Sequence, residues 1–132
     1  MSKNQIFLLL AIKIASTLQK EKVQISLSKA NIPFLVTLYK HGLIQNFLLL
    51  APLVTLKKKI QILIYLRYFF NKPICKNLKI LSKPSLTLGL TFTDICLLYD
   101  KRHTIFLSTS YGILTNLECK KKNIGGITLF KC

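Results

Sequence analysis

Acidic residues are almost missing from this sequence of 132 residues, which has four Asp and Glu against 20 Lys and Arg and a formal net charge of +16. Repulsion among so many cations destabilises a compact fold unless a partner of opposite charge neutralises it. Because none of the four acids pairs with another, the usual carboxylate machinery of catalysis is also missing. We therefore expect a protein that is not an enzyme, has no small-molecule substrate, and binds either nucleic acid or an anionic membrane surface.

Long apolar runs are missing as well, although 51% of the residues are hydrophobic. The two longest runs cover residues 6–12 and 47–54, and a helix that spans a bilayer needs about 20 apolar residues. The basic start followed by residues 6–15 has some likeness to a signal peptide. Its helical spacing favours a core helix instead, so the sequence predicts no membrane span.

Closely spaced metal ligands are another absence. The four cysteines form no C-x-x-C pair, and the two histidines do not complete a site with them; they are Cys75, Cys96, Cys119 and Cys132. Structural zinc sites normally bring their ligands in close pairs. We therefore expect no metal and no cofactor, and reduced thiols of the kind found in an intracellular compartment.

Glycine, alanine, arginine and proline are scarce and together make up 15 residues, whereas Lys, Ile, Phe, Tyr and Asn make up 54. The codons of the favoured group are rich in A and T, which indicates the genome of an organelle. The predicted location is the mitochondrial matrix, with a plastid as the alternative.

The positive charge is present in both halves of the chain. Residues 1–66 have nine Lys against Glu21, and residues 67–132 have eleven Lys or Arg against three acids, so each half has a net charge of +8. This distribution differs from that of a neutral domain with a basic arm. Both halves are therefore expected to face a polyanion, as in a protein embedded in RNA.

The hydrophobic periodicity predicts an α+β fold with two small subdomains, 1–66 and 75–132, joined by a linker at 67–74. The first subdomain should have the order α-β-α-β-β: a helix at 4–17, a strand at 23–27, a helix between an N-cap at Ser28 and Gly42, and strands at 47–55 and 59–66 around Lys57-Lys58-Lys59. The second should be mostly β, with strands at 78–81, 86–92, 104–109, 113–115 and 127–130 and a short helix that has its N-cap at Asn116 and runs through Lys122.

Three consecutive hydroxyl residues, Ser108, Thr109 and Ser110, stand where a predicted strand enters a turn at Tyr111-Gly112. Short hydroxyls can donate to phosphates, accept from 2′-hydroxyls and enter the shallow minor groove of A-form RNA. Tyr111 could stack on a base or a ribose. The alternative is an ordinary hairpin turn, in which Ser, Thr and Gly are common.

Two other patterns lie near this turn. Asp100 and His103 precede the serines, but nothing in the sequence is similar to a nucleophile elbow, so a Ser-His-Asp triad is not predicted. The lysine run Lys120, Lys121 and Lys122 would ordinarily be a solvated face. In a chain of charge +16 it is better explained by contact with phosphates.

Together these motifs resemble the universal small-subunit ribosomal protein eight family over nearly the whole chain. The resemblance lies in Ser-Thr-Ser-x-Gly-x-x-Thr ending at Thr115, a basic helix at Lys120–Lys122, and Gly125-Gly126 before the last strand. Upstream, Lys83-Pro84-Ser85-Leu86 is similar to the family's basic-Pro-Gly-Leu turn. The N-terminal half matches at 9–13 and 38–44, although Ala11 stands where the family has Arg.

The resemblance implies a non-catalytic protein that binds and organises the central domain of small-subunit ribosomal RNA beside neighbouring small-subunit ribosomal proteins. It implies RNA contacts at Ser108, Thr109, Ser110, Tyr111, Gly112, Thr115, Lys83, Pro84, Lys120, Lys121, Lys122 and, in the first helix, Lys13. The alternative function is a small basic protein bound peripherally to an organelle membrane, and an unrelated RNA-binding module comes third.

Overall fold

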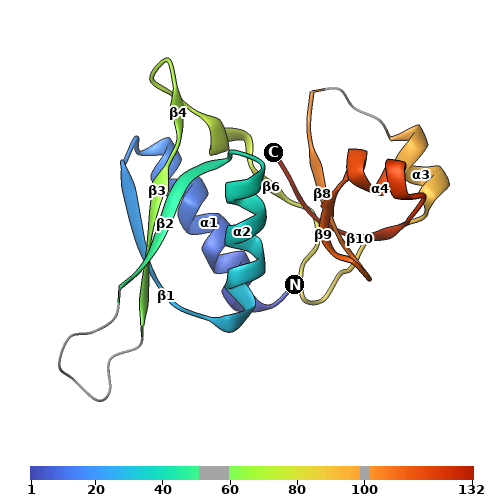
Figure 1. The fold of residues 1–132 in the computed structure, drawn as a ribbon, viewed down its shortest axis with the longest axis horizontal. Coiled ribbons are helices and arrows are strands. Elements are labelled where there is room, and N and C mark those ends of the chain that lie inside the picture. Colours follow the sequence, from blue (N-terminus) through green and yellow to red (C-terminus); the bar gives the residue numbers. More distant parts are fainter. Residues whose placement is uncertain (51–59, 99–101) are drawn as a thin grey trace. The chain divides into compact units, whose positions relative to one another are not determined.

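A computed structural model describes residues 1–50, 60–98 and 102–132, which divide into two compact units (Figure 1). The N-terminal unit is Phe7–Asn77, and the C-terminal unit is Leu78–Cys132 together with Met1–Ile6. Both units combine helices with antiparallel strands, so the predicted α+β class is confirmed. The predicted basic turn Lys57-Lys58-Lys59 and the acid Asp100 lie outside the described residues.

The N-terminal unit has the predicted order α-β-α-β-β. Its elements are α1 (Lys3–Thr17), which belongs to this unit from Phe7 onward, β1 (Lys22–Ser26), the short 3-10 helix η1 (Lys29–Asn31), α2 (Ile32–Lys40), β2 (Ile44–Leu50) and β3 (Gln61–Leu66). The three strands form an antiparallel sheet in the order β1-β3-β2. Strand β2 begins three residues before the predicted start.

The core of this unit lies between its sheet and its two long helices, which cover the same face of the sheet (Figure 1). The central strand β3 alternates between buried and more exposed positions, as period 2 requires. Its buried side chains meet those of the helices: Ile62, Ile64 and Leu66 from β3, Leu8, Leu9 and Ile12 from α1, and Phe34, Leu35 and Leu38 from α2. Each such side chain contributes about 1.5–3 kcal/mol relative to an exposed one.

Of the two predictions for the ends of α2, the one for its start is wrong and the one for its end is confirmed. Ser28 precedes η1 and makes no side-chain capping bond, and the residue at the N-cap of α2 is Asn31. At the other end Gly42 has φ +69°, a left-handed conformation that glycine adopts without strain and that commonly ends a helix. The predicted stop at Gly42 is therefore confirmed.

Residues 67–74, predicted as a linker, have secondary structure of their own. They contain the hairpin of β4 (Tyr68–Phe69) and β5 (Lys72–Pro73), followed by the 3-10 helix η2 (Ile74–Asn77). The Tyr68 hydroxyl donates to the carbonyl of Lys20, which ties the hairpin to the N-terminal unit. Where the domain boundary falls stays a prediction.

The C-terminal unit is a sheet with two short helices. Its elements are β6 (Lys79–Ile80), β7 (Gly89–Leu90), α3 (Phe92–Leu97), β8 (Ile105–Thr109), β9 (Gly112–Thr115), α4 (Asn116–Lys122) and β10 (Gly126–Lys131). The strand order is β6-β10-β8-β9, and β7 also pairs with β10. In the parts of the chain that the structure describes, no helix has the length and apolar character needed to cross a membrane.

The helix α3 was not predicted, and the strand predicted at 86–92 is wrong beyond the two residues of β7. Thr91 caps the helix: its hydroxyl accepts from the Asp94 N–H, and the Asp94 carboxylate accepts from the Thr91 N–H at 2.9 Å. This capping box satisfies two backbone donors that a helix start otherwise leaves unpaired. Ile95 then packs with Leu107, Leu114 and Cys119 in the core of the unit.

Candidate nucleic-acid interface

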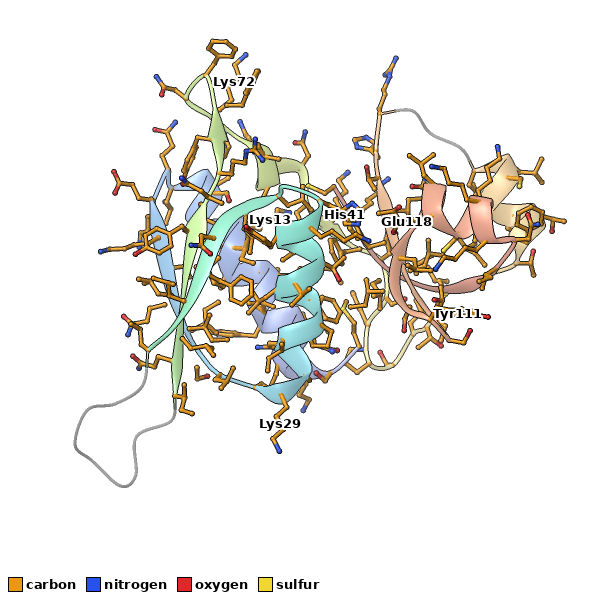
Figure 2. The ribbon with its side chains drawn as sticks, viewed as in Figure 1. Lys13, Lys29, His41, Lys72, Tyr111 and Glu118 are labelled. Carbon is orange, nitrogen blue, oxygen red and sulfur yellow. The ribbon has the colours of Figure 1, made fainter. Side chains whose placement is uncertain are left out.

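The predicted RNA-binding turn, residues 108–112, is the tip of the β8–β9 hairpin, and we call it the hydroxyl turn. Thr109 pairs with Gly112, which leaves Ser110 and Tyr111 as the two residues of the loop. Gly112 has φ +100°, a conformation that L side chains rarely adopt. Figure 2 places Tyr111 at this tip, where its side chain is 70% exposed.

The three hydroxyls of the turn differ in what they do. The Thr109 hydroxyl donates to the Gly112 carbonyl at 2.9 Å and accepts from the Tyr111 N–H at 3.2 Å, so it braces the loop from within. Ser108 and Ser110 are both exposed. The structure therefore offers two outward hydroxyls on a braced tip, where the sequence predicted three equivalent ones.

The glycine pair Gly125-Gly126, at the start of β10, allows that strand to lie directly against the turn. A Cβ on Gly126 would stand 2.6 Å from the Ser108 carbonyl oxygen and 2.9 Å from Cγ2 of Thr109. A Cβ on Gly125 would stand 2.6 Å from the Leu90 carbonyl oxygen. Real Cβ atoms do not approach backbone so closely, so the position of Ser108 depends on glycine at 126.

Thr115 was predicted as an RNA contact, and the structure places it inside. It is 3% exposed, and its hydroxyl accepts from the Glu118 N–H at 3.3 Å while its own N–H donates to the Glu118 carboxylate at 3.0 Å. This second capping box starts α4. The predicted N-cap at Asn116 is therefore wrong by one residue, and Thr115 is the side chain that positions the basic helix.

Helix α4 presents all three lysines of its last turn to solvent, namely Lys120, Lys121 and Lys122. Cations at the C-terminal end of a helix interact favourably with its dipole. The Lys122 ammonium lies over the Tyr111 ring, 5.3 Å from its centroid. This cation–π contact joins the basic helix to the hydroxyl turn, and the Tyr111 side chain remains largely exposed.

Lys83 and Pro84 form a second exposed turn, closed by two backbone bonds between Lys83 and Leu86 of 2.9 and 3.1 Å. Ser85 is not among the described residues with positive φ, so the turn holds Ser without left-handed strain. The buried Ser82 hydroxyl donates to the Thr128 carbonyl of β10. Since β10 also contacts the hydroxyl turn, one strand supports both turns.

Lys13 is half-buried in α1 of the N-terminal unit and is therefore not part of the unit that holds the other predicted contacts. Cys119, on the buried face of α4, is fully buried, and this burial raises the pKa of its thiol, with the Glu118 carboxylate acting in the same direction. A thiol held in its neutral form is a packing group rather than a nucleophile.

Sequence reasoning missed the polar groups that position the site. Thr91-x-x-Asp94 and Thr115-x-x-Glu118 both have the spacing of a capping box, and that signal was available in the sequence. The buried Ser82–Thr128 pair had no such signal, because 46 positions separate the two residues.

The C-terminal unit of this basic protein has two exposed hydroxyls, a largely exposed aromatic ring and a lysine-rich helix. This combination is typical of a protein that binds nucleic acid. The comparisons with known proteins are more specific. The family model of ribosomal protein S8 matches residues 7–132. The chain belongs to this family, and its role is that of a structural, non-enzymatic component of the ribosome.

Three curated relatives illustrate the similarity. The chain is 33% identical to the small ribosomal subunit protein uS8m of Acanthamoeba castellanii over 122 residues, which cover 91% of both chains. It is 32% identical to the small ribosomal subunit protein uS8 of Mycoplasmopsis pulmonis over 90% of this chain and 87% of the relative. It is 32% identical to the small ribosomal subunit protein uS8 of the Aster yellows witches'-broom phytoplasma over 92% of this chain and 90% of the relative.

Proposed function

We propose that this protein binds and orders the central domain of small-subunit ribosomal RNA in a mitochondrion, with the hydroxyl turn as its principal contact. The observation that carries the proposal is the pair of exposed hydroxyls, Ser108 and Ser110, on a tip whose shape Thr109 and Gly112 hold from within. A braced tip reads the shape of RNA at little entropic cost, since it is already ordered before binding.

The hydroxyls and the lysines of the site have different roles in this proposal. Ser108 and Ser110 donate to phosphate or exchange hydrogen bonds with 2′-hydroxyls, which distinguishes RNA from DNA. The α4 lysines and Lys83 add affinity that is independent of sequence, because each neutralised phosphate releases counterions. Tyr111, with Lys122 on one ring face, offers its other face to a base. Thr115 acts by positioning α4 rather than by touching RNA.

Two observations support the proposal that the protein works in the small subunit of a mitochondrial ribosome. Membership in the S8 family and similarity to proteins named for the small ribosomal subunit support binding to its RNA and to neighbouring ribosomal proteins. The bias toward Lys, Ile, Phe, Tyr and Asn supports the genome of an organelle. Small subunits sedimented from lysed mitochondria at moderate salt should contain the protein, whereas its recovery only in the membrane pellet would reject the ribosomal setting.

The role of the turn is tested with the double variant Ser108→Ala/Ser110→Ala and a central-domain rRNA fragment. Losing two hydrogen bonds should weaken binding about tenfold while the salt dependence stays unchanged, because no charge is removed. Ser26→Ala, at an exposed serine of β1 in the N-terminal unit, is the control and should bind normally. Unaltered affinity of the double variant would disprove the role of the turn.

A further inference from the structure

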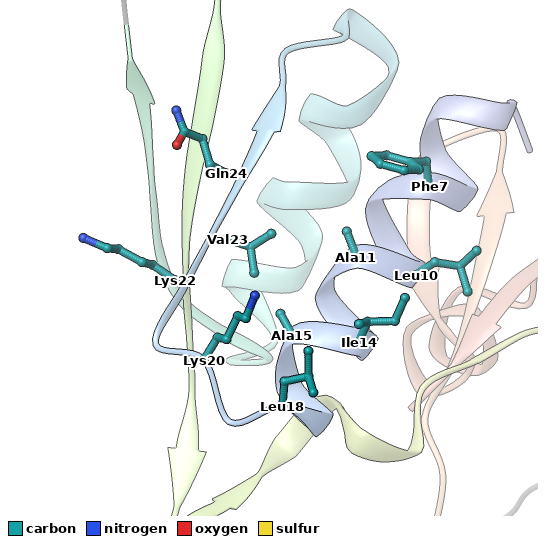
Figure 3. Close-up of a pocket in the computed structure, with 10 residues that line it drawn as sticks. All are labelled: Phe7, Leu10, Ala11, Ile14, Ala15, Leu18, Lys20, Lys22, Val23 and Gln24. Atoms are coloured by element: carbon teal, nitrogen blue, oxygen red, sulfur yellow. The ribbon is translucent and has the colours of Figure 1, made fainter.

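Between α1 and β1 of the N-terminal unit lies an open apolar groove of about 470 Å³ that the RNA-binding turn does not involve (Figure 3). Its helical side is a stripe of large apolar residues that are each between 42% and 63% exposed: Phe7, Leu10, Ile14 and Leu18. Ala11, Ala15 and Val23 complete the apolar lining. A contiguous exposed apolar surface of this kind marks an interaction site more often than an idle surface.

The other side of the groove is the open edge of a β-sheet. The order β1-β3-β2 makes β1 an edge strand among the described residues. Its backbone bonds to β3 fall at odd-numbered positions, since the Leu66 N–H donates to Glu21 and the Leu27 N–H donates to Ile60. In an antiparallel ladder the residues between them, Lys22 and Gln24, then direct their backbone groups away from β3.

Figure 3 agrees with this geometry. The side chains of Lys22 and Gln24 leave β1 on the side opposite to Val23, so these two residues border the groove with their backbone. The Lys20 side chain extends on the same side as Val23, at one end of the groove. The groove therefore combines a row of backbone donors and acceptors, an apolar wall and one cation.

We propose that the α1–β1 groove receives an extended segment of a neighbouring protein, which adds a fourth strand to the sheet beside β1. Main-chain bonds to Lys22 and Gln24 supply affinity, and alternate apolar side chains of the segment cover the α1 stripe. An acidic residue of the segment meets Lys20. This surface lies on the N-terminal unit, so the inference does not depend on which residues bind RNA.

Other occupants fit the groove less well. RNA would place phosphates and hydroxyls against an apolar wall that offers them no donors, which leaves polar groups desolvated without partners. A second copy would bring a charge of +16 against another +16. A lipid surface is flat on this scale, whereas the space is a groove between a helix and a strand.

The inference is tested in purified small subunits by a photo-cross-linking amino acid at Ile14, with the same group at Val36 as a control. The two positions are matched, since both are helical sites in the N-terminal unit with exposures of 57% and 50%. Immunoblotting first establishes that the tagged chain co-sediments with small subunits, which tests the ribosomal setting separately. A cross-link from Ile14 to a protein segment with alternating apolar residues supports the inference.

A synthetic peptide of the cross-linked segment then distinguishes strand addition from simple apolar contact. Gln24→Pro removes an outward N–H without removing a bond to β3, and an edge strand accepts proline at such a site. We expect Gln24→Pro and Ile14→Glu each to weaken peptide binding about tenfold, while Gln24→Ala and Val36→Glu bind normally. Circular dichroism verifies that each variant is folded.

Several results would overturn the inference. These are a cross-link from Ile14 to rRNA, to lipid or to a second copy of the chain, or no cross-link at all in subunits that contain the protein. Normal peptide binding by a folded Gln24→Pro variant would reject strand addition in particular.

Discussion

The C-terminal unit exposes short hydroxyls and lysines around residues 108–122, whereas the N-terminal unit exposes large apolar groups such as Phe7 and Ile14 along α1. Both units nevertheless have a strong positive charge: +10 for the N-terminal unit, with eleven Lys or Arg against Glu21, and +6 for the C-terminal unit, with nine against three acids. Charge alone therefore does not single out the unit that holds the hydroxyl turn. The difference lies in what accompanies the charge: braced polar groups in one unit, and an apolar groove beside an open strand in the other. The following predictions act on this contrast.

The largest effect is expected from Gly126→Ala. Its Cβ would stand 2.6 Å from the Ser108 carbonyl oxygen, so the backbone of β8 or β10 must move. We expect a loss of about 1–3 kcal/mol in the free energy of unfolding, as for overpacking in a core, and loss of binding to the rRNA fragment. Gly89→Ala is the control, since its Cβ would meet nothing within 4 Å. Urea unfolding and a binding titration measure both. Equal behaviour of the two variants would mean that the glycine pair does not position the turn.

Thr115→Ala should have the next largest effect. It removes the hydroxyl that caps α4, and losing an N-cap costs about 0.5–2 kcal/mol of stability. Weaker RNA binding should follow, because the lysines of α4 are then held less firmly. Thr115→Ser keeps the hydroxyl and should remain close to wild type in both measurements. If Thr115→Ala weakened binding without any change in urea unfolding, Thr115 would be a direct contact after all.

Lys121→Ala compares the two units directly. If this side chain meets a phosphate, the slope of log K against log salt should fall by roughly 0.7–0.9. Lys29→Ala removes an exposed lysine of the N-terminal unit and should leave the slope for a central-domain fragment unchanged. An equal decrease for both variants would show that the N-terminal unit also lies on this RNA.

The smallest effect concerns pH and the cap of α3. Hydrogen bonds from the Thr91 hydroxyl and N–H lower the pKa of the Asp94 carboxyl below its usual 3.8. A lowered folded-state pKa means that its contribution to stability is present above pH 3.8 and is lost as the pH falls through the folded value. Between pH 6 and pH 3 the wild type should therefore lose more stability to urea than Asp94→Asn. Parallel losses in the two proteins would exclude a role for this ionisation.

Much of the fold could be predicted because its pattern is local. Helix α1 begins within one residue of the prediction, and β8, β9 and α4 are where alternation, Gly112 and the lysine run indicate. Helix α3 was missed because apolar residues alternate through 86–92 and favour a strand, while the capping box at Thr91 decides the local structure. One local signal, the capping box, therefore outweighed another, the alternation of apolar residues.

Which residues make up the candidate site stays a prediction, and the sequence alone does not show what each of their side chains does in the fold. The sequence shows a row of hydroxyls. Only the folded hairpin shows that the Thr109 hydroxyl is hydrogen-bonded within the loop, to the Gly112 carbonyl, and that Thr115 is buried. The apolar groove escaped prediction as well. It depends on β1 being an edge strand, and strand order follows from long-range pairing that one sequence does not reveal.

Strand β10 contacts the hydroxyl turn through Gly126 and Ile127 and the Lys83–Pro84 turn through Thr128. The distance between the two turns is therefore set by the register of one strand. Inserting or deleting a single residue in β10 would shift both turns and reverse which side chains face the core. Insertions or deletions in β10 should thus be tolerated less well than substitutions in the two exposed turns. This holds although the buried side chains of β10, at residues 128–130, do not touch RNA themselves.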